Sequence, residues 1–195
     1  YPHWVNFIRE QLEAQYDAQT IYRSGFNVYT TLDPTLQDQA QALVTDQVSQ
    51  LADKNAHNGA LVSIKPSTGE ILAMVNWPSY NPNAGGTGDP ALRRNRAVTD
   101  VLEPGSVIKA FTVAAGIESG KFNAETLIDT TPGTLPVANH IVRDIHDYGV
   151  VNLTRLLTKS SNVGATKIAL QLTNDHLYDV FHRFGFGEVS GCGFP

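Results

Sequence analysis

The pattern of hydrophobic and polar positions divides this chain into three regions. The first, from Tyr1 to about Ala52, is polar and helical in pattern. A short extended stretch, residues 26–32, interrupts it. Asp33-Pro34 then has the chemistry of a helix start and predicts a second helix. The apolar positions that recur at helical spacing in the first helix are Trp4, Phe7, Ile8 and Leu12.

The second region predicts a β-hairpin followed by a buried helix. Two strand-like runs, residues 59–65 and 70–76, are joined by Pro-Ser-Thr-Gly, which is typical of a turn. A loop rich in Pro, Asn and Gly follows. An apolar helix then begins near Ser106, and Gly120 supplies its stop. The third region, from Asp129, predicts a short hairpin-like piece around 140–148 and helical segments around 153–172 and 175–184.

Composition narrows the function classes. The chain has 195 residues, of which 42% are hydrophobic and 17% charged, as in an ordinary folded protein. The net charge of −5 gives no electrostatic footprint for nucleic acid. Cys192 is the one cysteine, so a disulfide framework and a cysteine-based zinc site are excluded. The six histidines lack metal-ligand spacing, so we expect no metal and no cofactor.

Ser106 and Lys109 are the first candidates for chemistry. A spacing of three residues puts both side chains on one face of a helix. Burial lowers the pKa of a lysine, so that its free amine can accept the proton of an attacking serine hydroxyl. The helix N-terminus also favours negative charge near Ser106. The alternative is a helix-capping serine followed by an exposed lysine, because Ser-x-x-Lys occurs by chance about once per 200 residues.

Three stretches of the chain together resemble the transpeptidase domain of penicillin-binding proteins, most closely the division-type, monofunctional class. They are residues 59–83, 94–122 and 157–170. The motifs occur in the family's order, with Ser-x-x-Lys at 106–109 followed by Ser-x-Asn at 160–162. The resemblance covers most of the chain from about Asn58. It implies a serine β-lactamase/transpeptidase-like α/β (α+β) fold, with helices packed on a mainly antiparallel sheet.

The resemblance also implies a role for each motif residue. Ser106 would be the nucleophile that attacks the penultimate D-Ala carbonyl, and Lys109 its general base. Ser160 would relay the proton or position the lysine, and Asn162 would hydrogen-bond both Lys109 and the substrate amide. The residues 160–162 also suit a helix N-cap, and both interpretations can hold. The candidates for substrate binding are Ser161, Trp77 and Tyr80, the last two with packing as the alternative.

Two departures from the family pattern concern the ends of the chain. The third family motif, Lys-Thr-Gly, is absent, and we expect its strand after Pro195 if the chain is part of a longer one. Residues 22–41 resemble the segment that leads into the transpeptidase domain of bifunctional penicillin-binding proteins. We therefore expect a linker or pedestal at 1–57 and the N-terminal part of the transpeptidase domain at 58–195. A natural hybrid, an engineered chain and a partial chain all fit this mosaic.

The function that follows from the resemblance is that of a serine acyltransferase of peptidoglycan synthesis. It would cross-link peptidoglycan stem peptides as a D-Ala-D-Ala transpeptidase, and β-lactam antibiotics would acylate Ser106. Cell-wall synthesis or division proteins are the expected partners, at the outer face of the cytoplasmic membrane in the bacterial envelope. A class D-like β-lactamase or β-lactam sensor is the alternative enzyme, although class D has Ser-x-Val as its second motif. A non-catalytic scaffold fragment is the alternative of another class.

Overall fold

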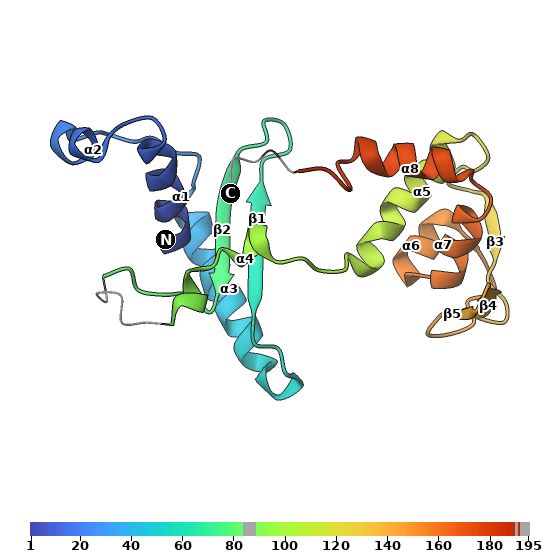
Figure 1. The fold of residues 1–195 in the computed structure, drawn as a ribbon. Helices are drawn as coiled ribbons and strands as arrows, with labels where there is room; N and C mark the ends of the chain where they lie inside the picture. The colour runs from blue at the N-terminus through green and yellow to red at the C-terminus, as the bar shows by residue number, and fades with distance from the viewer. Residues whose placement is uncertain (84–88, 190, 192–195) are drawn as a thin grey trace. The chain divides into compact units, whose positions relative to one another are not determined.

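The computed structural model describes residues 1–83, 89–189 and 191, which form two compact units (Figure 1). The first unit comprises residues 1–101, and the second begins at Leu102. Among the described residues, the first unit contains helices and one antiparallel strand pair, and the second contains helices and two such pairs. Among the described residues, no helix combines the length and the apolar character needed to cross a membrane.

Two of the helices in the first unit begin at a capping aspartate, and the sequence predicts the one at Asp33. Asp33 accepts a hydrogen bond from the Leu36 amide at 3.0 Å, and Pro34 occupies the first turn, where its missing N–H costs nothing. Asp17 caps the shorter helix in the same way, through the Thr20 amide at 2.9 Å. The helices are α1 (Pro2–Glu13), α2 (Ala18–Ser24) and α3 (Pro34–Gln50), followed by the 3₁₀ turn η1 (Ala52–Lys54).

The predicted hairpin forms as β1 (Gly59–Ile64) and β2 (Ile71–Trp77), and α3 packs along it (Figure 1). Gln37 fastens the helix to the hairpin, because its buried amide donates to the Met74 carbonyl at 2.9 Å and accepts from the Met74 N–H at 2.7 Å. The expected extended stretch 26–32 is not a strand. It adjoins the hairpin through single bonds, such as Thr31 Oγ1 to the Ile71 carbonyl at 2.6 Å.

The last part of the first unit is tied to β2 by a buried asparagine. Asn76 is 1% exposed, and its side chain donates to Asn95 Oδ1 at 2.8 Å and accepts from the Ala97 N–H at 3.0 Å. Both bonds satisfy polar groups that would be costly to bury alone. They fix the segment that contains η2 (Pro90–Arg93) and α4 (Arg96–Thr99).

The second unit is built around α5 (Ile108–Glu118), which the 3₁₀ turn η3 (Gly105–Val107) precedes. Helices α6 (Leu153–Lys159), α7 (Asn162–Ala169) and α8 (Asn174–Arg183) pack against α5 (Figure 1). Gly116 allows the close approach of α7, because a Cβ there would lie 2.8 Å from Ile168 Cγ2. Ile168 is fully buried, and burial of such a side chain contributes about 1.5–3 kcal/mol.

Two antiparallel strand pairs complete the second unit, and one of them corrects the prediction. The pairs are β3 (Leu127–Asp129) with β6 (Val150–Asn152), and β4 (Thr134–Val137) with β5 (His140–Arg143). The hairpin therefore lies at 134–143 and not at 140–148. Pro136 hid its first strand, because proline is depleted in strands, yet here Pro136 pairs with Ile141.

The helical segment predicted at 153–172 is divided in two by Ser160. This residue has φ 54° and ψ 43°, the left-handed conformation that ends α6. The side chain of Ser161 then caps α7 by accepting a hydrogen bond from the Gly164 amide at 2.9 Å. The break places the second motif at the turn between α6 and α7.

Candidate active site

Ser106 stands in an exposed turn directly before α5. Gly105 has φ 56°, a left-handed conformation that residues with a Cβ rarely adopt, so the Pro-Gly pair before Ser106 has a conformational reason. The turn presents the serine hydroxyl at the N-terminal end of the helix, where the helix dipole favours negative charge.

Lys109 lies one helical turn after Ser106 and is only 7% exposed. Its Nζ is 3.0 Å from Ser106 Oγ, 2.9 Å from Ser160 Oγ and 2.6 Å from the Ser160 carbonyl oxygen. Burial lowers the pKa of the Lys109 ammonium below its usual 10.5, and the negative charge of Asp144 opposes that shift. The structure thus brings Ser106, Lys109 and Ser160 together, although Ser160 is 51 residues away from Lys109 in sequence.

The left-handed conformation of Ser160 gives Lys109 two acceptors from one residue. Such a conformation costs a non-glycine residue on the order of 1–3 kcal/mol and persists where the surroundings hold it. Here the Ser160 and Ser161 amides donate to the Leu157 and Leu156 carbonyls, each at 3.0 Å. The turn therefore aims both the carbonyl and the hydroxyl of Ser160 at the amine.

Asn162 opens α7 and lines the same cavity as Ser106 and Lys109. Its Nδ2 donates to the Arg143 carbonyl at 2.7 Å, which ties it to β5. Among the described residues, the expected hydrogen bond between Asn162 and Lys109 is not formed, because Lys109 Nζ is directed at the two serines. The side-chain oxygen of Asn162 is left for other partners.

Ser161 has a structural role in this site, whereas the sequence suggested that it contacts the substrate. It is fully buried, its hydroxyl donates to Asp144 Oδ2 at 2.6 Å, and its oxygen accepts from the Gly164 amide at 2.9 Å. Both hydrogen-bonding capacities of the hydroxyl are thereby used inside the protein. Ser161 supports the turn on which its neighbours stand.

Asp144 is the residue at this site that sequence reasoning missed. Besides Ser161, its carboxylate binds the backbone amides of Asn162 and Val163. These contacts span 17 to 19 residues and depend on the β4–β5 hairpin, which the hydrophobic pattern placed elsewhere. No local pattern around Asp144 could therefore have indicated them.

A cavity of about 420 Å³ adjoins the motif residues. Its polar lining includes the motif residues Ser106, Lys109 and Asn162. The rest of its wall is mainly small or apolar, and consists of Gly105, Ile108, Thr112, Val142, Ala165, Thr166 and Ala169.

Trp77 and Tyr80 belong to the first unit. Trp77 ends β2, and the Tyr80 ring packs edge-on against the His3 ring with centroids 5.2 Å apart. The packing alternative for Tyr80 thus has a partner, and substrate binding by these two residues stays a prediction.

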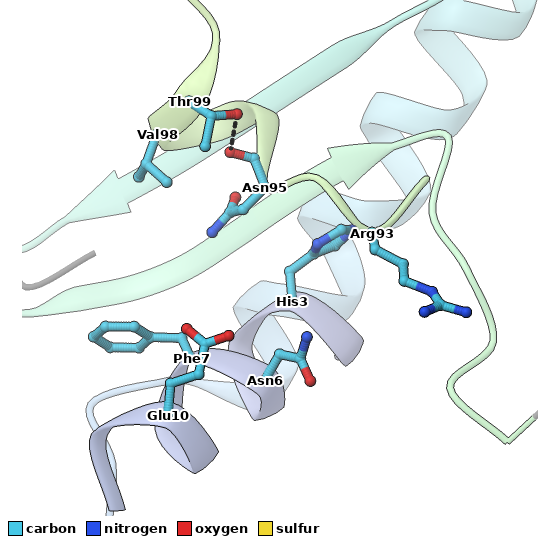
Figure 2. A pocket seen from close by; sticks show the side chains of 8 residues that line it. All are labelled: His3, Asn6, Phe7, Glu10, Arg93, Asn95, Val98 and Thr99. Carbon is cyan, nitrogen blue, oxygen red and sulfur yellow. Dashed lines mark hydrogen bonds between the residues drawn. The ribbon is translucent and has the colours of Figure 1, made fainter. Parts of the chain in front are cut away.

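A second cavity, of about 140 Å³, lies in the first unit between α1 and the segment that contains η2 and α4 (Figure 2). His3, Asn6, Phe7 and Glu10 face Arg93, Asn95, Val98 and Thr99 across it. Within the described residues, His3 Nε2 is buried and has no hydrogen-bond partner. Its described lining residues include neither a serine nor a lysine, so the Ser106–Lys109 pair has no counterpart there.

Comparison with known sequences agrees with the motifs. Residues 59–195 match the family described as the penicillin binding protein transpeptidase domain. The chain is 42% identical over 140 residues to the probable peptidoglycan D,D-transpeptidase PbpC of Pseudomonas aeruginosa, covering 72% of this chain and 25% of that protein. It is 38% identical over 178 residues to the peptidoglycan D,D-transpeptidase FtsI of Escherichia coli, covering 90% of this chain and 29% of that protein.

Solved structures show the same fold. The transpeptidase domain of penicillin-binding protein 3 from Burkholderia pseudomallei is 28% identical, with a TM-score of 0.68, and the match covers 88% of this chain and 46% of that one. A peptidoglycan glycosyltransferase from Burkholderia ambifaria is 31% identical, with a TM-score of 0.74, covering 86% of this chain and 48% of that one. This chain thus spans less than half the length of each of these relatives. The predicted fold class and resemblance are confirmed, and the chain belongs to the penicillin-binding protein transpeptidase domain family.

Proposed function

We propose that this chain carries the acylation machinery of a peptidoglycan D,D-transpeptidase. The observation that supports it most is the position of Lys109 Nζ, which belongs to a buried side chain and lies within 3.0 Å of both the Ser106 and the Ser160 hydroxyl oxygens. A nucleophile and a base within hydrogen-bond reach are the geometric requirement for an activated serine. The family membership makes the D-Ala-D-Ala end of a peptidoglycan stem peptide the expected acyl donor.

The neutral form of Lys109 has the right bonding pattern for a base. Two of its hydrogens are donated to Ser160, to the carbonyl oxygen at 2.6 Å and the hydroxyl oxygen at 2.9 Å. Its lone pair is then left to accept the proton of the Ser106 hydroxyl, whose oxygen lies 3.0 Å from Nζ. The lowered pKa of Lys109 raises the fraction of this neutral form at a given pH.

The reaction then proceeds through an acyl-enzyme intermediate. Ser106 Oγ attacks the penultimate D-Ala carbonyl while its proton passes to Lys109 Nζ, and a tetrahedral oxyanion forms. The Ser106 backbone N–H is one donor for that oxyanion. The C–N bond to the last D-Ala breaks, Lys109 returns the proton to the leaving amine, directly or through the Ser160 hydroxyl, and an ester to Ser106 remains. An amine of a second stem peptide attacks the carbonyl carbon of this ester, and its proton passes through Lys109 to the departing Ser106 Oγ. The C–O bond breaks, the cross-linking amide remains, and the serine is free again.

A β-lactam would acylate Ser106 by the same steps, with the carbonyl of the β-lactam ring in place of the peptide carbonyl. Opening of the ring leaves the ester on Ser106. Stem peptides and β-lactams are therefore the partners that we propose, and the outer face of the bacterial cytoplasmic membrane is where such donors would be met.

Acylation by a fluorescent penicillin tests the proposal. Intact-mass measurement should show one adduct, and peptide mapping should place it on Ser106. The variant S106A should lose the adduct. The control S67A, in the turn of the first hairpin, should keep it. A folded wild-type protein that forms no adduct would refute the proposal and favour a non-catalytic scaffold. An adduct on another residue would refute the assignment of Ser106 as the nucleophile.

A further inference from the structure

We infer that Asp144 is a positioning residue for acylation: its carboxylate holds the turn 160–162 against Lys109 and places a negative charge beside that amine. This inference rests on the proposed function, because it concerns the same site. Asp144 touches neither reacting atom and acts through the turn. It belongs to the second unit together with all the residues that it organises.

The first support is the number of donors that converge on this one carboxylate. Oδ2 accepts from the Ser161 hydroxyl at 2.6 Å, and Oδ1 accepts from the Val163 amide at 3.0 Å and also from the Asn162 amide. Two of these donors are unpaired amides at the N-terminus of α7, where a negative charge is favourable. Three hydrogen bonds thus fix the Asp144 carboxylate at the start of α7.

The second support is that Asp144 is itself firmly held. Its N–H donates to the Gly133 carbonyl at 2.9 Å, directly beyond the last pair of the β4–β5 hairpin. The preceding residue, Arg143, accepts the side chain of Asn162 through its carbonyl at 2.7 Å. Two consecutive residues at the end of β5 thus fix both the backbone and the side chain of Asn162.

The third support is the conformation of Ser160, which the turn must hold in place. A left-handed serine relaxes when its surroundings no longer over-determine it. Ser161 and Asn162 follow directly, and Asp144 binds both. Loss of the carboxylate would therefore free the turn and move the Ser160 carbonyl and hydroxyl away from Lys109.

The charge of Asp144 acts on Lys109 as well. Burial lowers the lysine pKa, and the Asp144 carboxylate raises it. No other charged group among the described residues perturbs this pKa, although the elements around α5 and the β5 strand carry several. Those groups are Glu118, His140, Arg143, Arg155, Lys159, Lys167, Asp175, His176, Asp179, His182 and Arg183.

Two variants separate the positioning effect from the charge. D144N removes the charge and places a side-chain amide opposite three hydrogen-bond donors. The maximal rate of penicillin acylation should therefore fall roughly tenfold or more, because a misplacement of catalytic groups by about 1 Å can cost on the order of 100-fold in rate. With the opposing charge gone, the acid limb of the pH profile should move to lower pH. S161A keeps the charge but removes one bond, so the rate should fall while the limb stays in place.

D147N is the matched control, an exposed aspartate three residues along, whose carboxylate accepts only the local Gly149 amide at 2.9 Å within the described contacts. It should leave both rate and limb unchanged. D144E restores the charge and should return the limb toward its wild-type position. If D144N does not fold, the pH–rate profiles of S161A and D144E test the inference instead. A purely structural aspartate would change the acylation rates of these variants without giving their acid limbs different positions. Wild-type rate and limb in folded D144N would overturn the inference.

A readout without substrate distinguishes this inference from the proposed function. The ε-carbon resonance of Lys109, assigned by its loss in K109M, should titrate at lower pH in D144N than in wild type. If that shift occurs in a protein that penicillin never acylates, the proposed function fails and the role of Asp144 in the site stands. If acylation is normal and the resonance does not shift in D144N, the charge part of the inference fails and the function stands.

Discussion

Replacement of Lys109 by methionine tests the general base most directly. Methionine is nearly as good a helix former as lysine and has a similar length, so it should occupy the buried position in α5. The substitution deletes the amine that contacts Ser106 and Ser160. Loss of a general base typically costs about 10²–10⁴-fold in rate, which corresponds to about 3–5 kcal/mol in activation free energy.

The stability of K109M should change much less than its rate. Hydrogen bonds to a charged group contribute about 1.5–3 kcal/mol each, and their loss destabilises the folded state. The variant no longer buries a charge, however, and that removes a penalty of several kcal/mol. These two effects oppose each other, so we expect the free energy of unfolding to change by no more than about 2 kcal/mol.

The assay is the rate of acylation by a fluorescent penicillin, measured beside urea unfolding of the same samples. The control is K121M, because Lys121 is exposed and its Nζ donates to the Gln171 carbonyl at 2.6 Å, in the same unit but outside the motif. K121M should acylate at the wild-type rate. Acylation by folded K109M within a few-fold of wild type would show that Lys109 is not the base.

Three further results follow from the geometry. Because the base must be neutral and burial lowers the Lys109 pKa, the acylation rate should be lost as pH falls through a value below 10.5, and a profile with an ordinary lysine pKa would contradict this. Urea unfolding should show S160G to be more stable than S160A by about 1 kcal/mol, since glycine accepts the left-handed φ of 54° without strain. Both variants should be acylated slowly, because both lack the Ser160 hydroxyl. Ile168 is fully buried, so I168A should destabilise the protein by about 2–5 kcal/mol. A smaller loss would mean that α5 and α7 can move together and fill the space that the shorter side chain leaves.

The parts of the site that the sequence predicted depend on local geometry. The three-residue spacing of Ser106 and Lys109 places both on one helical face, because helix geometry alone fixes that relation. The second motif was expected at a helix start, and Ser161 does cap α7. The β1–β2 hairpin and α3 also agree with their turn and capping residues.

The parts that escaped prediction depend on long-range packing. Asp144 reaches the turn 160–162 only because β4 and β5 pair, and Pro136 concealed that pairing. The burial of Ser161 follows from the same contact, so a motif residue that looked open to substrate became internal. The left-handed conformation of Ser160 is likewise set by its surroundings, since serine has no intrinsic preference for it.

The clasp between Gln37 and the first hairpin has a consequence for how such chains can be recombined. A side-chain amide offers the same donor and acceptor as a backbone peptide, and Gln37 uses both on the N–H and carbonyl of Met74. These two groups are present whatever side chain stands at position 74, proline apart. A β1–β2 hairpin from a diverged relative would thus still form both hydrogen bonds with Gln37. The condition is that no residue is inserted or deleted between position 74 and the turn of the hairpin. We therefore expect this joint to tolerate an exchange of segments between branches of the family, and to be broken by a change in the spacing of its two partners.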